Sequence, residues 1–204
     1  MSTQRKRSKW RCLAAPALCA LGLALVVGLG ERQARARADC AGIAIEPAAQ
    51  RVLPGRVVTV AVVISSPQQL LQGVDAYLDF DPLYLQVVDA LGNPATTVEP
   101  GTTLPVILQN RANNALGQIG YSAGIALGTP AITGTFTLAT LHLKCIRPIR
   151  PEGTTVAFAF DREHNRYTEV AYRGMPVLGV HTDGALYPYP TLILPVIWKH
   201  HYLR

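Results

Sequence analysis

The clearest pattern in the chain is an alternation of apolar and polar residues in the stretch QGVDAYLDFDPLYLQVVDA, residues 72–90. One side of the alternation is apolar and consists of Val74, Ala76, Leu78 and Phe80. The other side is polar and consists of Asp75, Tyr77 and Asp79. A period of two predicts a β-strand with one face buried and the other open to water or to a partner. Asp81-Pro82 ends the strand, because proline has no N–H to donate and aspartate favours turns.

Short segments of the same kind recur between turn signals, and no long segment shows helical periodicity. The expected strands span residues 41–47, 56–65, 72–80, 83–90, 104–110, 119–127, 136–146, 154–160 and 177–188. Tyr121 alternates in phase with Ile119 and Ala123, so we expect its ring to point inward. About nine short strands at this spacing predict one all-β domain, a nine-stranded antiparallel β-sandwich.

Residues 1–38 follow a different pattern from the strand region. A basic start, MSTQRKRSKWR, is followed by the apolar segment CLAAPALCALGLALVVGLG and then by Ala-Arg-Ala at 36–38. This order predicts a signal peptide that is cleaved before Asp39, which makes the mature domain (39–188) a secreted, extracellular protein. The alternative is an uncleaved helix that anchors the chain, because the apolar segment is about long enough to span a bilayer.

The net charge of +6 belongs to this leader and not to the domain. Eight of the 19 Lys and Arg residues and one of the 13 acidic residues lie in 1–38, which leaves 11 basic and 12 acidic residues. A domain that is close to neutral lacks the basic patch of a nucleic-acid-binding protein. We therefore expect no nucleic-acid partner.

The last residues, 189–204, pass from an apolar run at 192–198 to a basic cluster that includes Lys199 and Arg204. Seven apolar residues are too few to span a membrane. The tail is either a closing strand or loose terminus, or a signal that retains the protein at the cell surface. A membrane contact is thus expected only through an uncleaved leader or through this tail.

Two cysteines remain once the leader is removed. In an oxidising compartment Cys40 and Cys145 are predicted to form a disulfide, and the alternative is two separate thiols. Cys12 and Cys19 belong to the leader.

Catalytic motifs are missing from the sequence, which has no nucleophile elbow, no P-loop and no pair of metal-binding histidines. Asp161, Glu163 and His164 in the segment DREHN either surround a metal ion or form an ordinary polar loop. Asp79 and Asp81 offer oxygens to a calcium ion, although the turn already explains Asp81. We predict a protein that is not an enzyme and holds no cofactor or metal.

The order of the motifs resembles that of the cohesin family. The motifs are P-G-x-x-V-T-V-x-V-x-I at 54–64, G-V-x-A-Y-L-D-F-D-P-x-x-L-x-V-V at 73–88, IGYSAGIALGTPAITG at 119–134, F-T-L-A-T-L-H-L-K at 136–144 and DGALYP at 183–188. The resemblance runs from about residue 42 to residue 187. It implies a nine-stranded sandwich of jelly-roll type.

The resemblance also implies a function. Cohesins are the receptor modules by which scaffoldins hold dockerin-bearing enzymes in cellulosomes, so it implies a dockerin-like partner and a link to extracellular polysaccharide degradation. The partner would bind across one sheet face, formed by Asp75, Tyr77, Asp79, Ser122, Gly124, His142 and Lys144. The alternative is a carbohydrate-binding β-sandwich that contacts polysaccharide directly, because the same superfamily contains such modules.

Cleavage of the leader is the first testable prediction. The charged start, the apolar segment and the Ala-Arg-Ala site should direct removal of residues 1–38 on export. N-terminal sequencing of the secreted protein should begin at or near Asp39. A cell-retained product that still contains Trp10 would contradict cleavage and support the anchor.

Overall fold

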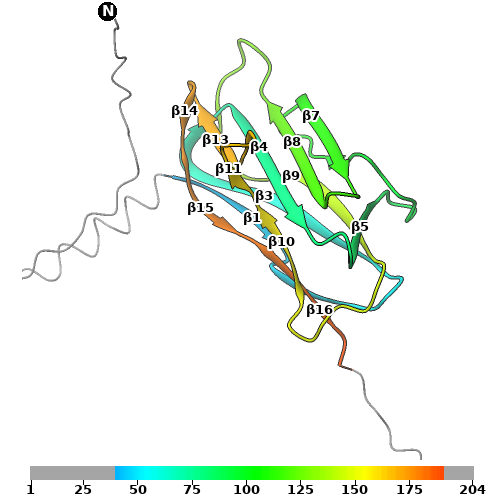
Figure 1. The fold of residues 1–204 in the computed structure, drawn as a ribbon. Coiled ribbons are helices and arrows are strands. Elements are labelled where there is room, and N and C mark those ends of the chain that lie inside the picture. The colour runs from blue at the N-terminus through cyan, green and yellow to red at the C-terminus, as the bar shows by residue number, and fades with distance from the viewer. Residues whose placement is uncertain (1–39, 191–204) are drawn as a thin grey trace, which may run out of the picture.

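The computed structural model describes residues 40–190, and within that range the chain forms strands and no helix (Figure 1). The predicted leader and nearly all of the predicted tail lie outside the described residues. No helix that is long and apolar enough to cross a membrane occurs between residues 40 and 190. The strands are β1 (Ala41–Glu46), β2 (Ala49–Val52), β3 (Val57–Leu71), β4 (Gly73–Phe80), β5 (Leu85–Val88), β6 (Glu99–Pro100), β7 (Val106–Asn113), β8 (Gln118–Gly124), β9 (Ile132–Cys145), β10 (Thr154–Phe158), β11 (Phe160–Asp161), β12 (Arg166–Tyr167), β13 (Glu169–Tyr172), β14 (Met175–Pro176), β15 (Leu178–Thr182) and β16 (Gly184–Pro188).

Two sheets pack face to face in this domain (Figure 1). The first, called here the β3–β9 sheet, has the order β15-β1-β3-β9-β5, with β6 beside β9. The second, called the β4–β8 sheet, has the order β14-β13-β4-β10-β16-β2, with β8 beside β4 and β7 beside β8. Strands β11 and β12 form a separate hairpin.

The predicted all-β sandwich is confirmed, and the structure adds two features to it. Strand β1 pairs with β15, and β2 with β16, in parallel, so the sheets are mixed and not purely antiparallel. In each pair, a strand near the start of the domain lies beside a strand near its end. Alternation along a single strand does not predict which distant strand it pairs with. The strand number exceeds nine partly because β6, β11, β12 and β14 have only two residues each.

The core forms where the inward side chains of the two sheets meet. Alternation along β4 holds as predicted, because Val74, Ala76, Leu78 and Phe80 are all buried. Tyr121 also points inward and is 2% exposed. Its hydroxyl has no hydrogen-bond partner among the described residues, and burial raises the pKa of the Tyr121 phenol.

The predicted disulfide between Cys40 and Cys145 is wrong. Cys40 lies against Gly179 of β15, at the end of the sheet where Ser65 pairs with Thr135. Cys145 lies at the other end of β9, opposite Leu85, and its thiol donates to the carbonyl of Arg147 at 3.0 Å. Ten residues of strand separate the two ends, about 33 Å, whereas bonded cysteines need Cα atoms within about 7 Å. Burial raises the pKa of the Cys145 thiol.

A buried threonine side chain completes the sheet beside Tyr77. On one edge of β4, residues 73–75 pair with β13 and residues 78–80 pair with β10, which leaves a gap opposite Tyr77. Thr168, which is fully buried, fills it. Its Oγ1 accepts the Tyr77 N–H at 3.1 Å and donates to the Tyr77 carbonyl at 3.0 Å. The Tyr77 carbonyl also accepts the Ala159 N–H at 2.8 Å. The hydroxyl thus supplies the missing partner of the Tyr77 N–H and helps to fix the backbone that carries Tyr77.

Replacing Thr168 by valine should therefore destabilise the domain. The change keeps the shape of the side chain but leaves the Tyr77 N–H without its partner, which we expect to lower the free energy of unfolding by about 1–3 kcal/mol. Urea unfolding measures this difference. Thr168→Ser keeps the hydroxyl and serves as the control, and a valine variant as stable as the wild type would contradict the role given to Thr168.

Candidate functional site

On the outward side of β4, β8 and β7, called here the β4–β8–β7 face, strand pairing places the outward residues in rows. Strand β4 pairs with β8 in one unbroken register from Gly73 opposite Gly124 to Asp79 opposite Gln118. Strand β8 pairs with β7 in turn. The four outward rows are Gly73–Gly124–Val106, Asp75–Ser122–Gln109, Tyr77–Gly120–Arg111 and Asp79–Gln118–Asn113. Neighbouring strands lie about 4.8 Å apart and successive rows about 7 Å apart.

Five of the seven predicted partner-binding residues lie together on this face. They are Asp75, Tyr77, Asp79, Ser122 and Gly124. Asp75 is exposed, and Tyr77 and Asp79 are half-buried. Ser122 and Gly124 are buried.

The other two predicted residues, His142 and Lys144, belong to a different surface, so the expected single patch of seven is wrong. Both lie on β9, in the β3–β9 sheet, and their outward side faces the opposite direction. The imidazole of His142 contacts Thr59 Oγ1 through Nδ1 at 3.0 Å and Glu99 through Nε2 at 3.1 Å. These bonds tie β9 to β3 and to β6. Alternation had shown that the residues point outward, but not from which sheet.

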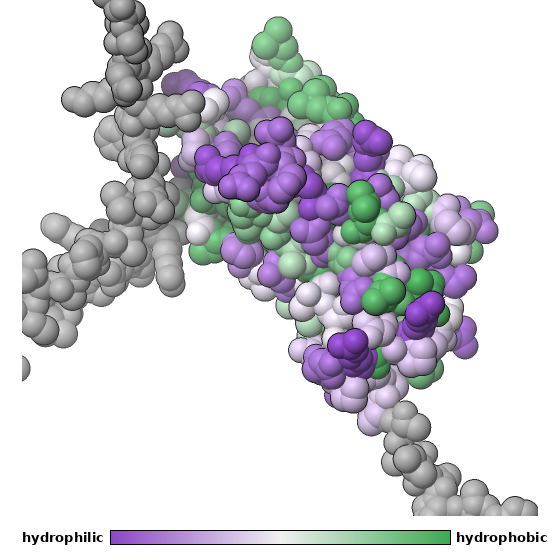
Figure 2. Space-filling model, in the orientation of Figure 1, coloured by the Kyte–Doolittle hydropathy of each residue, from purple (hydrophilic) through white to green (hydrophobic). Residues whose placement is uncertain are grey.

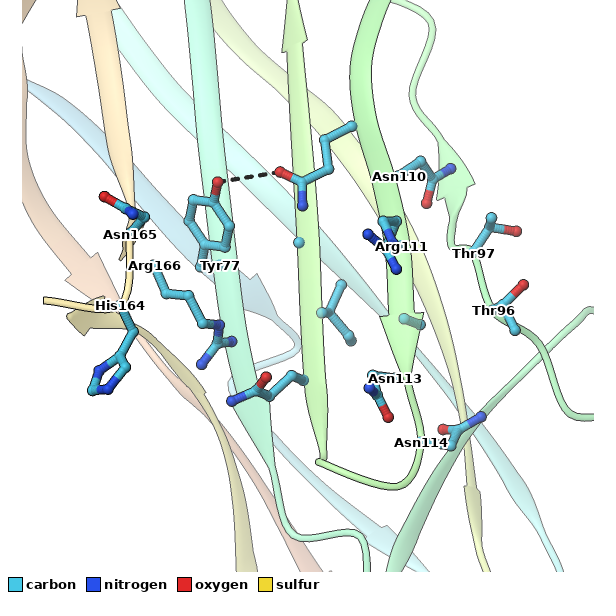
Figure 3. Close-up of a pocket in the computed structure, with 15 residues that line it drawn as sticks. Tyr77, Thr96, Thr97, Asn110, Arg111, Asn113, Asn114, His164, Asn165 and Arg166 are labelled. Carbon is cyan, nitrogen blue, oxygen red and sulfur yellow. Dashed lines mark hydrogen bonds between the residues drawn. The ribbon is translucent and has the colours of Figure 1, made fainter. Parts of the chain in front are cut away.

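A groove crosses the third and fourth rows of the face, between β7 and the β11–β12 hairpin (Figure 3). Its volume is about 820 Å³. The polar side chains along it include Tyr77, Gln109, Arg111, Gln118, His164 and Arg166. The groove is therefore bounded mainly by polar groups, which include two guanidinium groups that only donate hydrogen bonds.

The segment DREHN, a candidate metal site by its sequence, is the turn of the β11–β12 hairpin. Asp161 Oδ1 accepts the N–H groups of Glu163 and His164 at 3.0 and 3.2 Å. Its Oδ2 lies 2.7 Å from His164 Nδ1. The side-chain hydrogen bond from His164, helped by those backbone N–H groups, lowers the pKa of the Asp161 carboxyl. The carboxylate thus organises the turn that carries Arg166 to β4.

Arg166 is a residue of the site that the sequence did not reveal. From β12 its guanidinium reaches β4, where it pairs with the Asp79 carboxylate and donates to the Leu78 carbonyl at 2.9 Å. Its side chain is only 17% exposed. Asp79 therefore already has a cationic partner within the chain. Because 87 residues separate the pair, no local pattern could have indicated it.

The centre of the face is covered by side chains, whereas Gly73 and Gly124 in its first row, called here the bare row, carry none. The Tyr77 hydroxyl donates to Gln109 Oε1 at 3.1 Å, and the Gln109 side chain lies over Gly120. A Cβ added to Gly120 would lie 2.7 Å from Gln109 Nε2. At Gly73 and Gly124, by contrast, no side chain of the described residues lies within 4 Å of an added Cβ. Neither strand projects a side chain there, and of the two glycines Gly73 is half-exposed and Gly124 is buried.

Apolar side chains gather at the end of the face where β7 begins and β8 ends, and Figure 2 shows this end as a mainly hydrophobic area. Exposed apolar residues there are Val106, Ile107, Leu108 and Leu127. A register shift between Ile107 and Gln109 interrupts the pairing of β7 with β8 at this end. The face thus joins an apolar end, a bare backbone row and a polar groove.

No family model and no curated protein matches the sequence, but solved structures match the fold. CaCohA2 of Clostridium acetobutylicum, in its complex with CaDoc0917, shares 16% identity, with 73% of this chain and 99% of that chain covered and a TM-score of 0.57. A type II cohesin domain from the cellulosome of Acetivibrio cellulolyticus shares 17%, with 72% and 95% covered and a TM-score of 0.58. A non-cellulosomal cohesin of the archaeon Archaeoglobus fulgidus shares 14%, with 74% and 92% covered and a TM-score of 0.51. The chain has the cohesin fold.

Proposed function

We propose that the protein is a non-enzymatic binding module and that the β4–β8–β7 face docks a dockerin-type protein. The bare backbone row at Gly73 and Gly124 carries this proposal. Support also comes from the cohesin fold, which this chain shares with CaCohA2, a protein solved as a complex with CaDoc0917. The predicted leader would deliver the module outside the cell, where the docked partner would take part in polysaccharide degradation.

The shape of the face suits a helix from the partner. Long side chains normally hold a partner away from a sheet, but neither Gly73 nor Gly124 carries one, so a helix can approach the half-exposed backbone at Gly73. The exposed apolar residues beside this row, Val106 and Leu108 among them, supply area that a partner can bury. Asp75 stands next to the bare row and makes no ion pair within residues 40–190. Its carboxylate can accept a charge-assisted hydrogen bond.

Tyr77 and Asp79 have a different role from the one expected. Their polar atoms already bind Gln109 and Arg166, so they form a fixed wall of the site. Side chains that are held in place before binding lose little conformational entropy when the partner arrives. They contribute shape, while Asp75 contributes an open acceptor.

The alternative of direct polysaccharide binding has weaker support. Sugar rings stack on exposed aromatic side chains, and the four rows of the face contain one aromatic residue, Tyr77. That ring is half-buried, and its hydroxyl is bound to Gln109. A protein partner therefore fits the face better.

A bulky side chain at Gly73 tests the docking proposal. An added Cβ there would make only an ordinary contact, 3.6 Å from the Ala123 carbonyl, so Gly73→Leu should fold normally. The leucine should hold the partner helix away from the sheet and weaken binding by at least about tenfold. Isothermal titration calorimetry of the full chain against each dockerin module encoded in the same genome gives the affinities.

Thr137→Leu is the matched control, because Thr137 is exposed on β9 in the other sheet. It should leave the affinity unchanged. Equal binding by wild type and Gly73→Leu would reject this face. Retention on insoluble polysaccharide without any protein partner would favour the carbohydrate-binding alternative.

A further inference from the structure

Arg111 is a charged residue of the groove that residues 40–190 leave uncompensated. It lies on β7 in the third row of the face, beside Gly120, and is exposed. Within the described part of the chain no acidic group forms an ion pair with it. Figure 3 shows Arg111 and Arg166 on opposite sides of β8, where both line the groove.

The two arginines are not equivalent. Arg166 is largely buried and is bound to Asp79 and to the Leu78 carbonyl, so its charge is already used to hold the hairpin on β4. Arg111 has no such acidic partner among the described residues. Its planar guanidinium offers five N–H donors in a geometry that matches a carboxylate.

The amides on either side of Arg111 add donors and not acceptors. The Oε1 of Gln109 accepts the Tyr77 hydroxyl, which leaves the amide nitrogen over Gly120 for a ligand. The Oδ1 of Asn113 accepts the N–H groups of Ala115 and Leu116, which likewise leaves its amide nitrogen. Three neighbouring outward positions of β7 therefore present N–H groups. A carboxylate, which only accepts hydrogen bonds, is the group that complements them.

We infer that this groove binds an Asp or Glu side chain of the partner docked on the β4–β8–β7 face, with Arg111 as the residue that determines this specificity. The inference rests on the proposed function and extends it to the chemistry of the partner. The groove adjoins the bare row, so one partner surface can reach both.

The face then has two charged poles, which set the direction of the partner. Asp75 lies opposite Glu169 of β13 and forms an acidic pole. Arg111 lies one row away and two strands across, about 12 Å from Asp75. A helix covers that distance in about eight residues. A partner helix with a basic residue at one pole and an acidic residue about two turns away would fit in one direction only.

The experiment compares Arg111→Gln and Arg111→Lys in the full chain, titrated by calorimetry with each dockerin module encoded in the same genome. Losing a charge-assisted hydrogen bond should weaken binding by about 10–100-fold in Arg111→Gln, and the lysine variant should recover part of the affinity. Arg147→Gln removes an exposed arginine from the loop after β9 and should change affinity by less than about twofold. Equal urea midpoints would show that all three variants are folded.

A double-mutant cycle identifies the acidic group on the partner. Each surface Asp or Glu of the bound dockerin is replaced by its amide, and one replacement should cost affinity against wild type but not against Arg111→Gln. Unchanged binding by Arg111→Gln would overturn the inference and leave the docking proposal standing. Absence of dockerin binding by the wild type would reject the docking proposal itself. Arg111-dependent binding of polygalacturonate, without dockerin binding, would instead assign the groove to an acidic polysaccharide.

Discussion

The unbroken pairing of β4 with β8 is the constraint on which the rest of the structure depends. Seven residues of each strand are in register, and side chains alternate between the two sides of the sheet. The same ladder therefore sends Val74 and Leu78 into the core and Asp75 and Tyr77 onto the face. A slip of one residue would move the apolar side chains to the outer face and the polar side chains into the core. Burial of the apolar side chains therefore fixes the position of the polar ones. Core and candidate site are two consequences of one register.

Alternation explains why part of the site could be predicted from sequence and part could not. It assigns each residue to one side of its own strand, which sufficed for β4 and for the inward Tyr121. It does not say which strands are neighbours, so it cannot separate His142 and Lys144, which lie in the other sheet, from the residues of β4. The disulfide failed for a related reason, because Cys40 and Cys145 lie at opposite ends of the β3–β9 sheet. Arg166 and Thr168 act on β4 across about ninety residues, beyond the range of any local pattern.

Contacts within the chain decide which groups on the face are available to a partner. Tyr77 and Asp79 are bound by Gln109 and Arg166, and the backbone beneath Tyr77 is held by Thr168. These bonds make the middle of the face rigid. The polar atoms that form them bind other groups of the chain in place of water. Asp75 and Arg111, which form no ion pair within residues 40–190, stand at separate positions on either side of this middle. In the proposed complex, recognition would thereby be concentrated in a few groups on a fixed scaffold.

Glycine within a strand weakens it, by roughly 0.5–1 kcal/mol relative to alanine, unless the structure requires it. Outside the strands, in the turn between β7 and β8, Gly117 has such a reason, because its φ of 68° lies in the left-handed region. Gly120 has another, since Gln109 occupies the space above it. Gly73 has neither: its φ is not left-handed, and an added Cβ would meet only the Ala123 carbonyl at an ordinary distance. The fold alone would accept alanine at Gly73, and the docking proposed for this face supplies a reason for glycine there.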